Sequence, residues 1–464
     1  MFKILFIREL QNYLYSLRFQ ISFVIVTLVF IFGTIFYIVS TGDKQDNYNK
    51  FVQEQEKQLE ERIGNAGKVA VSRTNYILSP KSYAVIDDCK ENILPNSLSY
   101  SAYNVWSFNV KTASSNPYLK KAQGLNWAFI ISTIISFITL LFAFDAISGE
   151  KEDHTLSLVF SNKVSRASFI LSKFLSILTV MFCTILVGVI VSLLIISFSS
   201  KITINSYFLG NTLGFLSVCL LFISVMAIIG LLASTLSKQS NISLLICLTI
   251  WIFFAVVLPN ASVFIATKFF AIPTAKEVND IIKAEQDDIY KNAPEGSWSS
   301  YGGQPFYPAH ELRANNQSNL FNAEKKHKDA YYNQMFRQFE NTRIVAIFSP
   351  IMQFDCINEG ALGGGYLRFR KNWNDLHIFQ ESFLKWFKDL DARDEKSPHW
   401  YNPYEIISTT QQAVSLDQIP HYTEKAATLA ERIAYSQNYL IAMIALFGIV
   451  FAFCFVRFLR YDVR

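Results

Sequence analysis

The sequence predicts an all-α polytopic membrane protein with six transmembrane helices. The chain has a mean hydropathy of +0.23 and only 17% charged residues, a balance that is too apolar for an ordinary soluble protein. Its apolar residues gather in uncharged stretches of about 18 residues or more, which is the length that crosses roughly 30 Å of hydrocarbon. The predicted spans are residues 21–40, 127–144, 177–199, 208–236, 241–266 and 439–456.

Residues 1–20 are expected to form an interfacial helix before the first span. Phe2 and Phe6 are four positions apart, whereas Lys3 and Glu9 fall on the other face. Such a helix is either a gating or docking element or a simple topological anchor, and the sequence favours neither. The first span lacks a cleavage pattern at its end and is expected to stay in the mature protein.

Basic residues in the short loops predict that both termini lie in the cytoplasm. They cluster before the first span, after the second span and in the tail 457–464. These residues are Lys3, Arg8, Arg18, Lys151, Lys163, Arg166, Lys173, Arg457, Arg460 and Arg464. The insertions 41–126 and 267–438 also contain many lysines, but long loops translocate largely regardless of charge. Both insertions are therefore expected on the extracytoplasmic side.

The first insertion is predicted to be mixed in structure. Residues 46–63 are rich in Glu, Gln and Lys with a thin apolar stripe, which predicts a solvated helix that continues outward. Residues 68–72 and 82–86 alternate or carry β-branched side chains, and prolines separate such segments. We expect short strands and turns there.

The second insertion is predicted to be mostly helical. The helix candidates and the irregular loop between the first two are residues 275–291, 317–344, 372–390 and 417–436, and 294–308. In the fifth span, Pro259 lies in an uncharged run that is longer than a bilayer requires. We expect it to break the helix, so that the span 241–266 has a re-entrant end.

Six cysteines are present, and four of them fall inside the predicted spans, where Cys is usually a small apolar residue. Cys89 and Cys356 lie in the first and second insertions. An oxidising compartment would let these two form a disulfide. The alternative is that they are two separate buried thiols.

The spans contain no Asp, Glu, Lys, Arg or His, which argues against an ion-coupled transporter, because coupling needs such a group on the pathway. The run 64–69 has the wrong spacing for an ATP-binding loop and lacks its Ser or Thr. His310 and Glu311 lack the second His of a metalloprotease helix, since position 314 is Ala. The chain is therefore not expected to be an enzyme or to bind a metal.

The most informative segment is the polar loop 145–176 between the second and third spans. It reads Asp145-Ala-Ile-Ser-Gly-Glu150-Lys151-Glu152-Asp-His-Thr155-Leu156, and Arg166 and Lys173 follow. Such a stretch forms either a short helix on the inner membrane surface or an ordinary basic loop.

This loop resembles the coupling-helix signature of the ABC transporter type-2 permease family. In that signature an acidic residue closes the second span, a Glu precedes a Thr-Leu pair, and a basic residue and a Gly-Lys pair follow. The residues that match are Asp145, Glu150, Thr155, Leu156, Arg166 and Lys173. The sequence departs from the pattern at His154, where Gly is usual, at Asn162-Lys163, where Pro is common, and at Ser172, which replaces the Gly.

The order of elements along the whole chain resembles the same family, including the run 230–238 at the end of the fourth span. The two large insertions resemble a bacterial branch that includes permeases associated with gliding motility and with copper-enzyme maturation. The resemblance implies an ATPase-coupling site. Its expected members are Asp145, Glu150, Lys151, Glu152, Thr155, Leu156, Arg166 and Lys173.

The resemblance also implies partners. We expect a homodimer or a pair with a paralogous permease, bound to two copies of a separate cytoplasmic ABC ATPase in the bacterial inner membrane. ATP and Mg would bind to that ATPase, and this chain would bind no cofactor of its own. Membrane lipid and a periplasmic protein are further expected partners, and nucleic acid is not.

Two functional hypotheses follow, and a third is weak. The chain is either the permease subunit of an ATP-driven exporter or a mechanotransmission subunit that passes ATPase motion to a periplasmic partner and transports nothing. The size of the two insertions keeps the second hypothesis open. A membrane-embedded enzyme lacks any catalytic group of residues.

Overall fold

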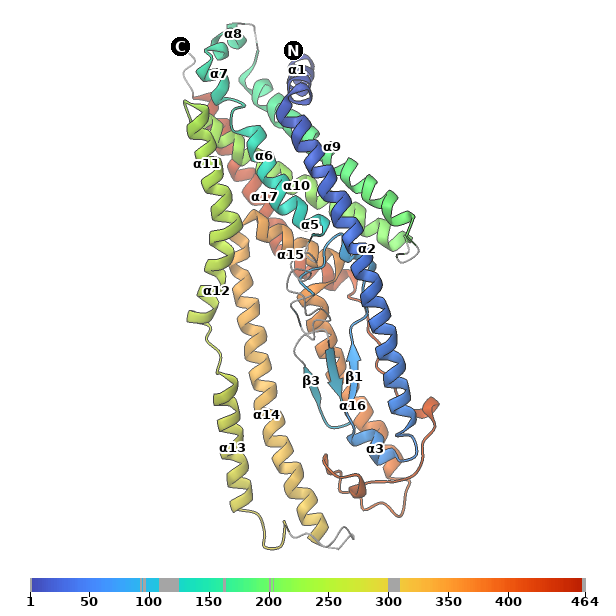
Figure 1. Ribbon diagram of the computed structural model, residues 1–464. Helices are drawn as coiled ribbons and strands as arrows, with labels where there is room; N and C mark the ends of the chain where they lie inside the picture. Colours follow the sequence, from blue (N-terminus) through green and yellow to red (C-terminus); the bar gives the residue numbers. More distant parts are fainter. Residues whose placement is uncertain are drawn as a thin grey trace.

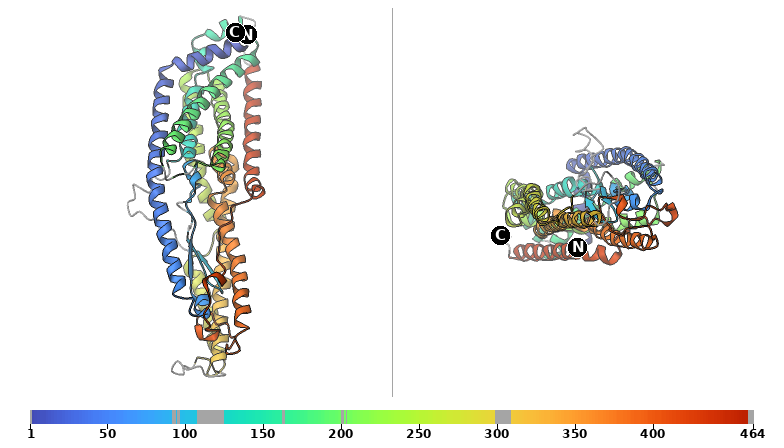
Figure 2. Two further views of the ribbon diagram at one scale, coloured as in Figure 1. Left: turned by 90° about the vertical axis from the view of Figure 1, so that its right-hand side faces the viewer. Right: turned by 90° about the horizontal axis from the view of Figure 1, so that it is seen from below.

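The computed structural model describes residues 2–91, 94, 97–107, 125–161, 164–199, 202, 204–298 and 309–460. The protein is elongated, with a helical membrane bundle at one end and a long lobe that extends from it (Figure 1). The start of the chain and the end of the last helix lie together at what we call the near end of the bundle (Figure 2). The lobe extends from the opposite, far end. Three predicted features lie outside the described residues. They are Lys163, Arg464 and residues 299–308 of the predicted loop 294–308.

The prediction of an all-α polytopic membrane protein is confirmed. Within the described part of the chain, six helices are long and apolar enough to cross a membrane. They are Leu17–Glu60, Trp127–Glu152, Arg166–Ser197, Ser206–Leu236, Ser240–Phe269 and Leu429–Leu459. Four of them carry one label each, namely α2 (Leu17–Glu60), α9 (Arg166–Ser197), α10 (Ser206–Leu236) and α17 (Leu429–Leu459).

A single residue, Ser16, separates the first two helices and caps the second. α1 (Phe2–Tyr15) ends before Ser16, whose side chain accepts a hydrogen bond from the backbone N–H of Phe19 and so caps α2. α2 then runs for 44 residues without a break. The predicted span 21–40 and all but the last three residues of the predicted solvated helix 46–63 are therefore parts of one helix that connects the bundle to the lobe.

The second and fifth spans each contain a π-helical segment. The second consists of α5 (Trp127–Phe129), η2 (Ile130–Ile135) and α6 (Ser136–Ala143), and the fifth of α11 (Ser240–Ile252), η3 (Phe253–Val257) and α12 (Leu258–Phe269). The break expected at Pro259 is absent, because the π segment directly before it widens the helix where the proline lacks an N–H. The fifth span thus runs as one continuous helix from Ser240 to Phe269.

The first insertion differs from its prediction in where the strands lie. Its elements are α3 (Ala66–Val71), β1 (Thr74–Ile77), the 3₁₀ helix η1 (Ser82–Val85), β2 (Ser97–Tyr100) and β3 (Val105–Ser107). The predicted strands at 68–72 and 82–86 are wrong, since both segments are mainly helical. Asn65 caps α3 by accepting from the backbone N–H of Lys68, and the N–H groups of Ala66 and Gly67 donate to carbonyls of the second insertion. Long-range contacts therefore override the local β-propensity.

The three strands form an antiparallel sheet in the order β1–β2–β3. Thr74 pairs with Tyr100, and Tyr100 pairs in turn with Val105. The sheet packs against α16 (Gly365–Asp391), where the ring of Tyr100 lies 6.0 Å from that of Phe383. Both insertions therefore contribute to one hydrophobic core in the lobe.

The second insertion is helical, as predicted, with shifted boundaries. Its elements are α13 (Ala275–Lys291), α14 (Ala309–Ile344), η4 (Val345–Phe348), α15 (Pro350–Leu362), α16, η5 (Ile406–Ser408) and η6 (Leu416–Gln418). The helix at 275–291 is confirmed at both ends, and Thr274 and Glu277 form its capping box. The predicted helix at 417–436 is wrong in its first part, because the regular helix begins only at Leu429.

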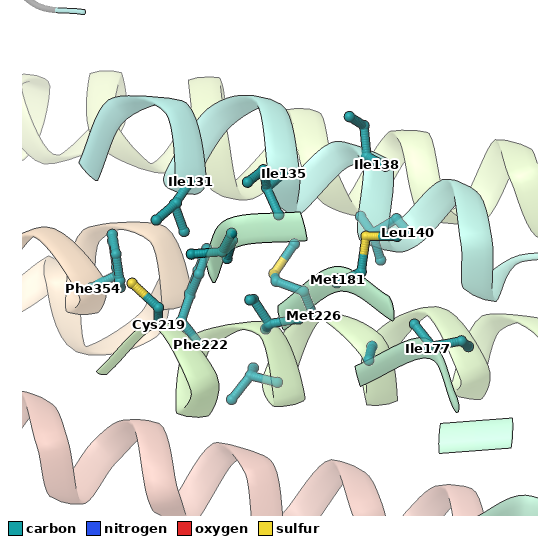
Figure 3. Close-up of a cluster of buried hydrophobic side chains, with 14 of the residues drawn as sticks. Ile131, Ile135, Ile138, Leu140, Ile177, Met181, Cys219, Phe222, Met226 and Phe354 are labelled. Atoms are coloured by element: carbon teal, nitrogen blue, oxygen red, sulfur yellow. The ribbon is translucent and has the colours of Figure 1, made fainter. Parts of the chain in front are cut away.

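α15 was not predicted, and it closes the far end of the bundle. Ser349 caps it, Pro350 occupies its first turn, and Gly363 ends it with a left-handed φ of +67°. The ring of Phe354 lies 4.6 Å from that of Phe222 on α10 (Figure 3). α15 also contacts α17 and both π segments, so it joins the lobe to four spans.

Gly230 allows a close approach between the second and fourth spans. A Cβ atom placed on Gly230 of α10 would lie 2.5 Å from the Cβ of Ala143 on α6. On the same helix, a Cβ on Gly214 would have no neighbour within 4 Å. Replacing either glycine with alanine thus adds the same methyl group, at a tightly packed position for Gly230 and at an open position for Gly214.

We expect Gly230→Ala to destabilise the protein by about 1–3 kcal/mol, because the added methyl forces α6 and α10 apart. Gly214→Ala is the matched control and is expected to be neutral or stabilising by up to about 1 kcal/mol through helix propensity. Thermal unfolding of the purified protein in detergent measures both. Equal midpoints for the two variants would show that the α6–α10 contact does not depend on Gly230.

Candidate functional site

The predicted coupling loop forms two short helices at the near end of the bundle, beside α1 (Figure 1). They are α7 (Ser148–Glu152) and α8 (Thr155–Ser161). His154 lies between them with a φ of +56°, in the left-handed region that glycine adopts most easily. The sharp turn between the helices therefore explains why glycine is usual at this position in the resembling pattern.

Lys173 on α9 holds α7 and α1 together. Its Nζ atom lies 2.6 Å from Oε1 of Glu150 on α7 and 3.2 Å from Oε1 of Glu9 on α1. Only 4% of the Lys173 side chain is exposed. An ammonium group this deeply buried requires compensating carboxylates, and here two helices distant in sequence supply them.

Asp145 makes a second link from this loop to the N-terminal helices. Its carboxylate forms an ion pair with Arg18 at the start of α2. The Arg18 guanidinium also lies 5.3 Å from the ring centroid of Phe144. Asp145, Glu150 and Lys173 are thus brought together around the junction of α1 and α2.

Lys151 and Glu152 connect α7 to the turn between the fourth and fifth spans. Nζ of Lys151 donates to the carbonyl oxygens of Thr235 at 2.6 Å and Ser237 at 3.0 Å, at the C-terminal end of α10. Oε2 of Glu152 accepts from the backbone N–H of Ser240 at 3.1 Å, at the start of α11. Each charge matches the sign of the helix end that it caps.

The remaining predicted residues have different surroundings. Thr155 Oγ1 donates to the carbonyl of Glu150 at 3.4 Å, and Leu156 is buried against the bundle. Arg166 is separate from the others, since its Nη1 donates to the carbonyl oxygens of Phe458 and Leu459 at the end of α17. The loop is therefore attached to most of the spans through named polar contacts.

Sequence reasoning missed several members of this site. Glu9 was assigned only to the polar face of α1, although a lone carboxylate in a basic N-terminal segment signals a possible ion pair. Ser234 of α10 was also missed, and its Oγ accepts from the backbone N–H groups of Ile147 and Ser148 at 2.9 Å each. Leu158 on α8 is the third residue that sequence reasoning missed, and 66% of its surface is exposed.

Cys89 and Cys356 are two buried free thiols in the structure and not a disulfide. The sulfur of Cys89 lies 2.9 Å from where a Cβ on Gly364 would be, whereas Cys356 faces the guanidinium of Arg343. Burial raises the pKa of both thiols, which keeps them protonated and unreactive at neutral pH.

No chemical centre is evident in the part of the chain that the structure describes. Those residues contain no group of three or more His, Cys, Asp or Glu arranged to hold a metal. The glycine-containing run 64–69 forms the start of α3, where the N–H groups of Ala66 and Gly67 already donate to carbonyls.

A family comparison agrees with this geometry. A model of the family described as "ABC-2 family transporter protein" matches residues 4–463. The chain belongs to the ABC-2 transporter family. No curated protein matches it. It is therefore an integral membrane permease subunit of an ABC transporter, a class that associates with an ABC ATPase.

We expect Lys173→Met to lower the free energy of unfolding by about 3–5 kcal/mol, because it leaves the carboxylates of Glu9 and Glu150 largely buried and uncompensated. Chemical unfolding in detergent measures the loss. Lys238→Met is the matched control, since Lys238 is exposed near the same end, and it should change stability by less than about 0.5 kcal/mol.

The triple variant Glu9→Gln, Glu150→Gln, Lys173→Met removes all three charges and should recover much of the lost stability. If Lys173→Met is as stable as Lys238→Met, the ion pairs do not hold the loop in place.

Proposed function

We propose that this chain is the permease subunit of an ATP-driven exporter in the bacterial inner membrane, with both termini in the cytoplasm. In this proposal two copies form a dimer, and a separate ABC ATPase subunit binds to each copy at the near end. ATP and Mg bind to the ATPase subunits. The observation that carries the proposal is the attachment of α7 to four other helices through Lys173, Lys151 and Glu152.

This attachment suits the transmission of force. A displacement of α7 acts on α1 and α9 through Glu150 and Lys173, and on α10 and α11 through the end-capping contacts. Coupling needs such a contiguous element, because motion of the ATPase has to reach the spans through packed structure. The uncharged interiors of the spans leave no other evident energy input.

The exposed face of α8 is the proposed contact with the ATPase. Thr155, Ser157 and Leu158 are exposed there, whereas Leu156 anchors the helix from its other side. Glu150 is only partly exposed and bound to Lys173, so we assign it to positioning the loop and not to direct contact. Burial of the exposed Leu158 side chain against the ATPase would remove apolar surface from water, which favours binding.

Mechanotransmission is the second candidate, and the length of two helices favours it. α2 has 44 residues and continues from the bundle into the lobe, and α14 has 36 residues and leads through η4 into α15. Continuous helices are stiff, so movement at the near end would displace the lobe and any periplasmic partner that binds to it.

We expect Leu158→Asp to weaken the complex with the ATPase from the neighbouring gene by roughly tenfold, because a charge replaces an apolar anchor at the interface. Co-purification and stimulation of ATP hydrolysis in nanodiscs measure the effect. The matched control is Ile378→Asp in the lobe, because Ile378 is 64% exposed and Leu158 is 66% exposed. Equal binding by both variants would contradict docking at α8.

Structures of the complex with and without ATP should separate the two candidates. Export predicts a continuous cavity between the permease copies in at least one nucleotide state. A sealed, dry interface in both states, together with a displaced lobe, would instead establish mechanotransmission.

A further inference from the structure

A cavity of about 300 Å³ lies where the far end of the bundle meets the lobe. It is bounded by residues 79–83, the first turn of α10, the end of α15 and residues 424–427 before α17. The charged residues that line it are Lys81, Arg368, Lys371, Lys425 and Glu424. Four of these five are cations, and none of the coupling residues of the near end contributes.

The single carboxylate of this lining is already neutralised. Glu424 accepts from the guanidinium of Arg368 at 2.6 Å and from Nζ of Lys81 at 3.0 Å. These hydrogen bonds and charges lower the pKa of Glu424 to about 2 despite its burial, so it stays ionised and holds both cations in place. Arg368 and Lys371 have further carboxylate partners outside the lining.

Lys425 is different. It is exposed at the cavity and has no ion-pair partner among the residues for which side chains are described. The charge that remains available to a ligand is therefore positive.

Asn211 lines the same cavity, and its side-chain amide has a buried hydrogen-bond donor without a partner in the described part of the chain. The residue is only 8% exposed, and its Oδ1 accepts from Nη2 of Arg432 at 3.0 Å. An arginine only donates, so this bond fixes the amide orientation and leaves Nδ2 as the free end. Nδ2 has no acceptor in the described part of the chain. A buried donor without a partner is costly, and a bound acceptor would remove that cost.

The start of α10 adds donors of the same kind. Asn205 caps this helix of 31 residues by accepting from the backbone N–H of Phe208 at 2.8 Å. The first N–H groups of a helix have no partner within it, and they carry the positive end of its dipole. Asn205, Tyr207 and Phe208 all line the cavity. An amide, an ammonium and a helix N-terminus thus surround one volume, and all three favour an anion.

We propose that this cavity binds a phosphate group, supplied either by the anionic headgroup of a membrane lipid or by a soluble phosphate. Donors placed on several sides suit an anion with several oxygen atoms. The first turn of a membrane span forms one wall, so the site lies at the level of the membrane surface, where lipid phosphates are located. Binding here involves only this chain and does not depend on the ATPase.

The test uses the purified full-length chain in a non-ionic detergent at constant ionic strength. Short-chain phosphatidylglycerol and inorganic phosphate are titrated separately, and the rise in the unfolding midpoint gives an apparent affinity for each. Stabilisation by phosphatidylglycerol alone identifies a lipid headgroup as the source. Stabilisation by inorganic phosphate supports the site and identifies a soluble source.

Two variants change the site, and one serves as a control. Asn211→Asp keeps the acceptor for Arg432 but replaces the free donor with a negative charge, and Lys425→Glu reverses an exposed charge. Each should weaken binding by roughly tenfold, the equivalent of one lost charge-assisted hydrogen bond. Lys268→Glu makes the same charge change at the exposed end of α12, away from the cavity, and should bind as the unchanged protein does.

Either of two results would overturn the proposal. One is that neither ligand stabilises the unchanged protein. The other is that the control loses as much affinity as the two site variants, since that would indicate general charge attraction and not a site.

Discussion

The near end of the bundle depends on the two ion pairs that the buried ammonium group of Lys173 makes with Glu9 and Glu150. A charge removed from water is costly, and its two ion pairs with Glu9 and Glu150 offset that cost only while α1, α7 and α9 keep their relative positions. Apolar packing alone is less directional, because many arrangements of Leu and Phe side chains bury similar areas. The ion pairs therefore specify one position for the coupling loop.

The other charges around the loop act on helix ends. Lys151 and Arg166 donate to the final carbonyls of α10 and α17, and Glu152 accepts at the start of α11. These backbone groups have no partner inside their helices, and each charge has the sign that its helix dipole favours. Charged residues at this end of the protein thus satisfy the free backbone groups at the ends of α10, α11 and α17.

The sequence predicts these elements unequally, for physical reasons. Apolar runs identify the six spans, and the 3.6-residue period identifies α13, because those signals are local. The helical state of residues 66–71 depends on N–H bonds to a segment more than 340 residues later, which no local pattern contains. The residues of the predicted coupling loop were selected by the resemblance of their types and order to a family pattern. Their partners, such as Glu9 and Ser234, come from other helices and needed the structure.

The contacts of α7 with α10, together with those of α10 with α15, also link the two ends of the molecule. In the proposed function, motion would enter at α7 and reach α10 at its C-terminal end, and the N-terminal half of α10 packs against Phe354 of α15. α15 also contacts the π segments of the second and fifth spans, and π segments occur frequently at functional sites. A rigid α10, bound by α7 at its C-terminal end and packed against α15 at the far end, would transmit a displacement along its axis. Export and mechanotransmission both require this path, so they differ only in whether the displacement opens a cavity or moves the lobe.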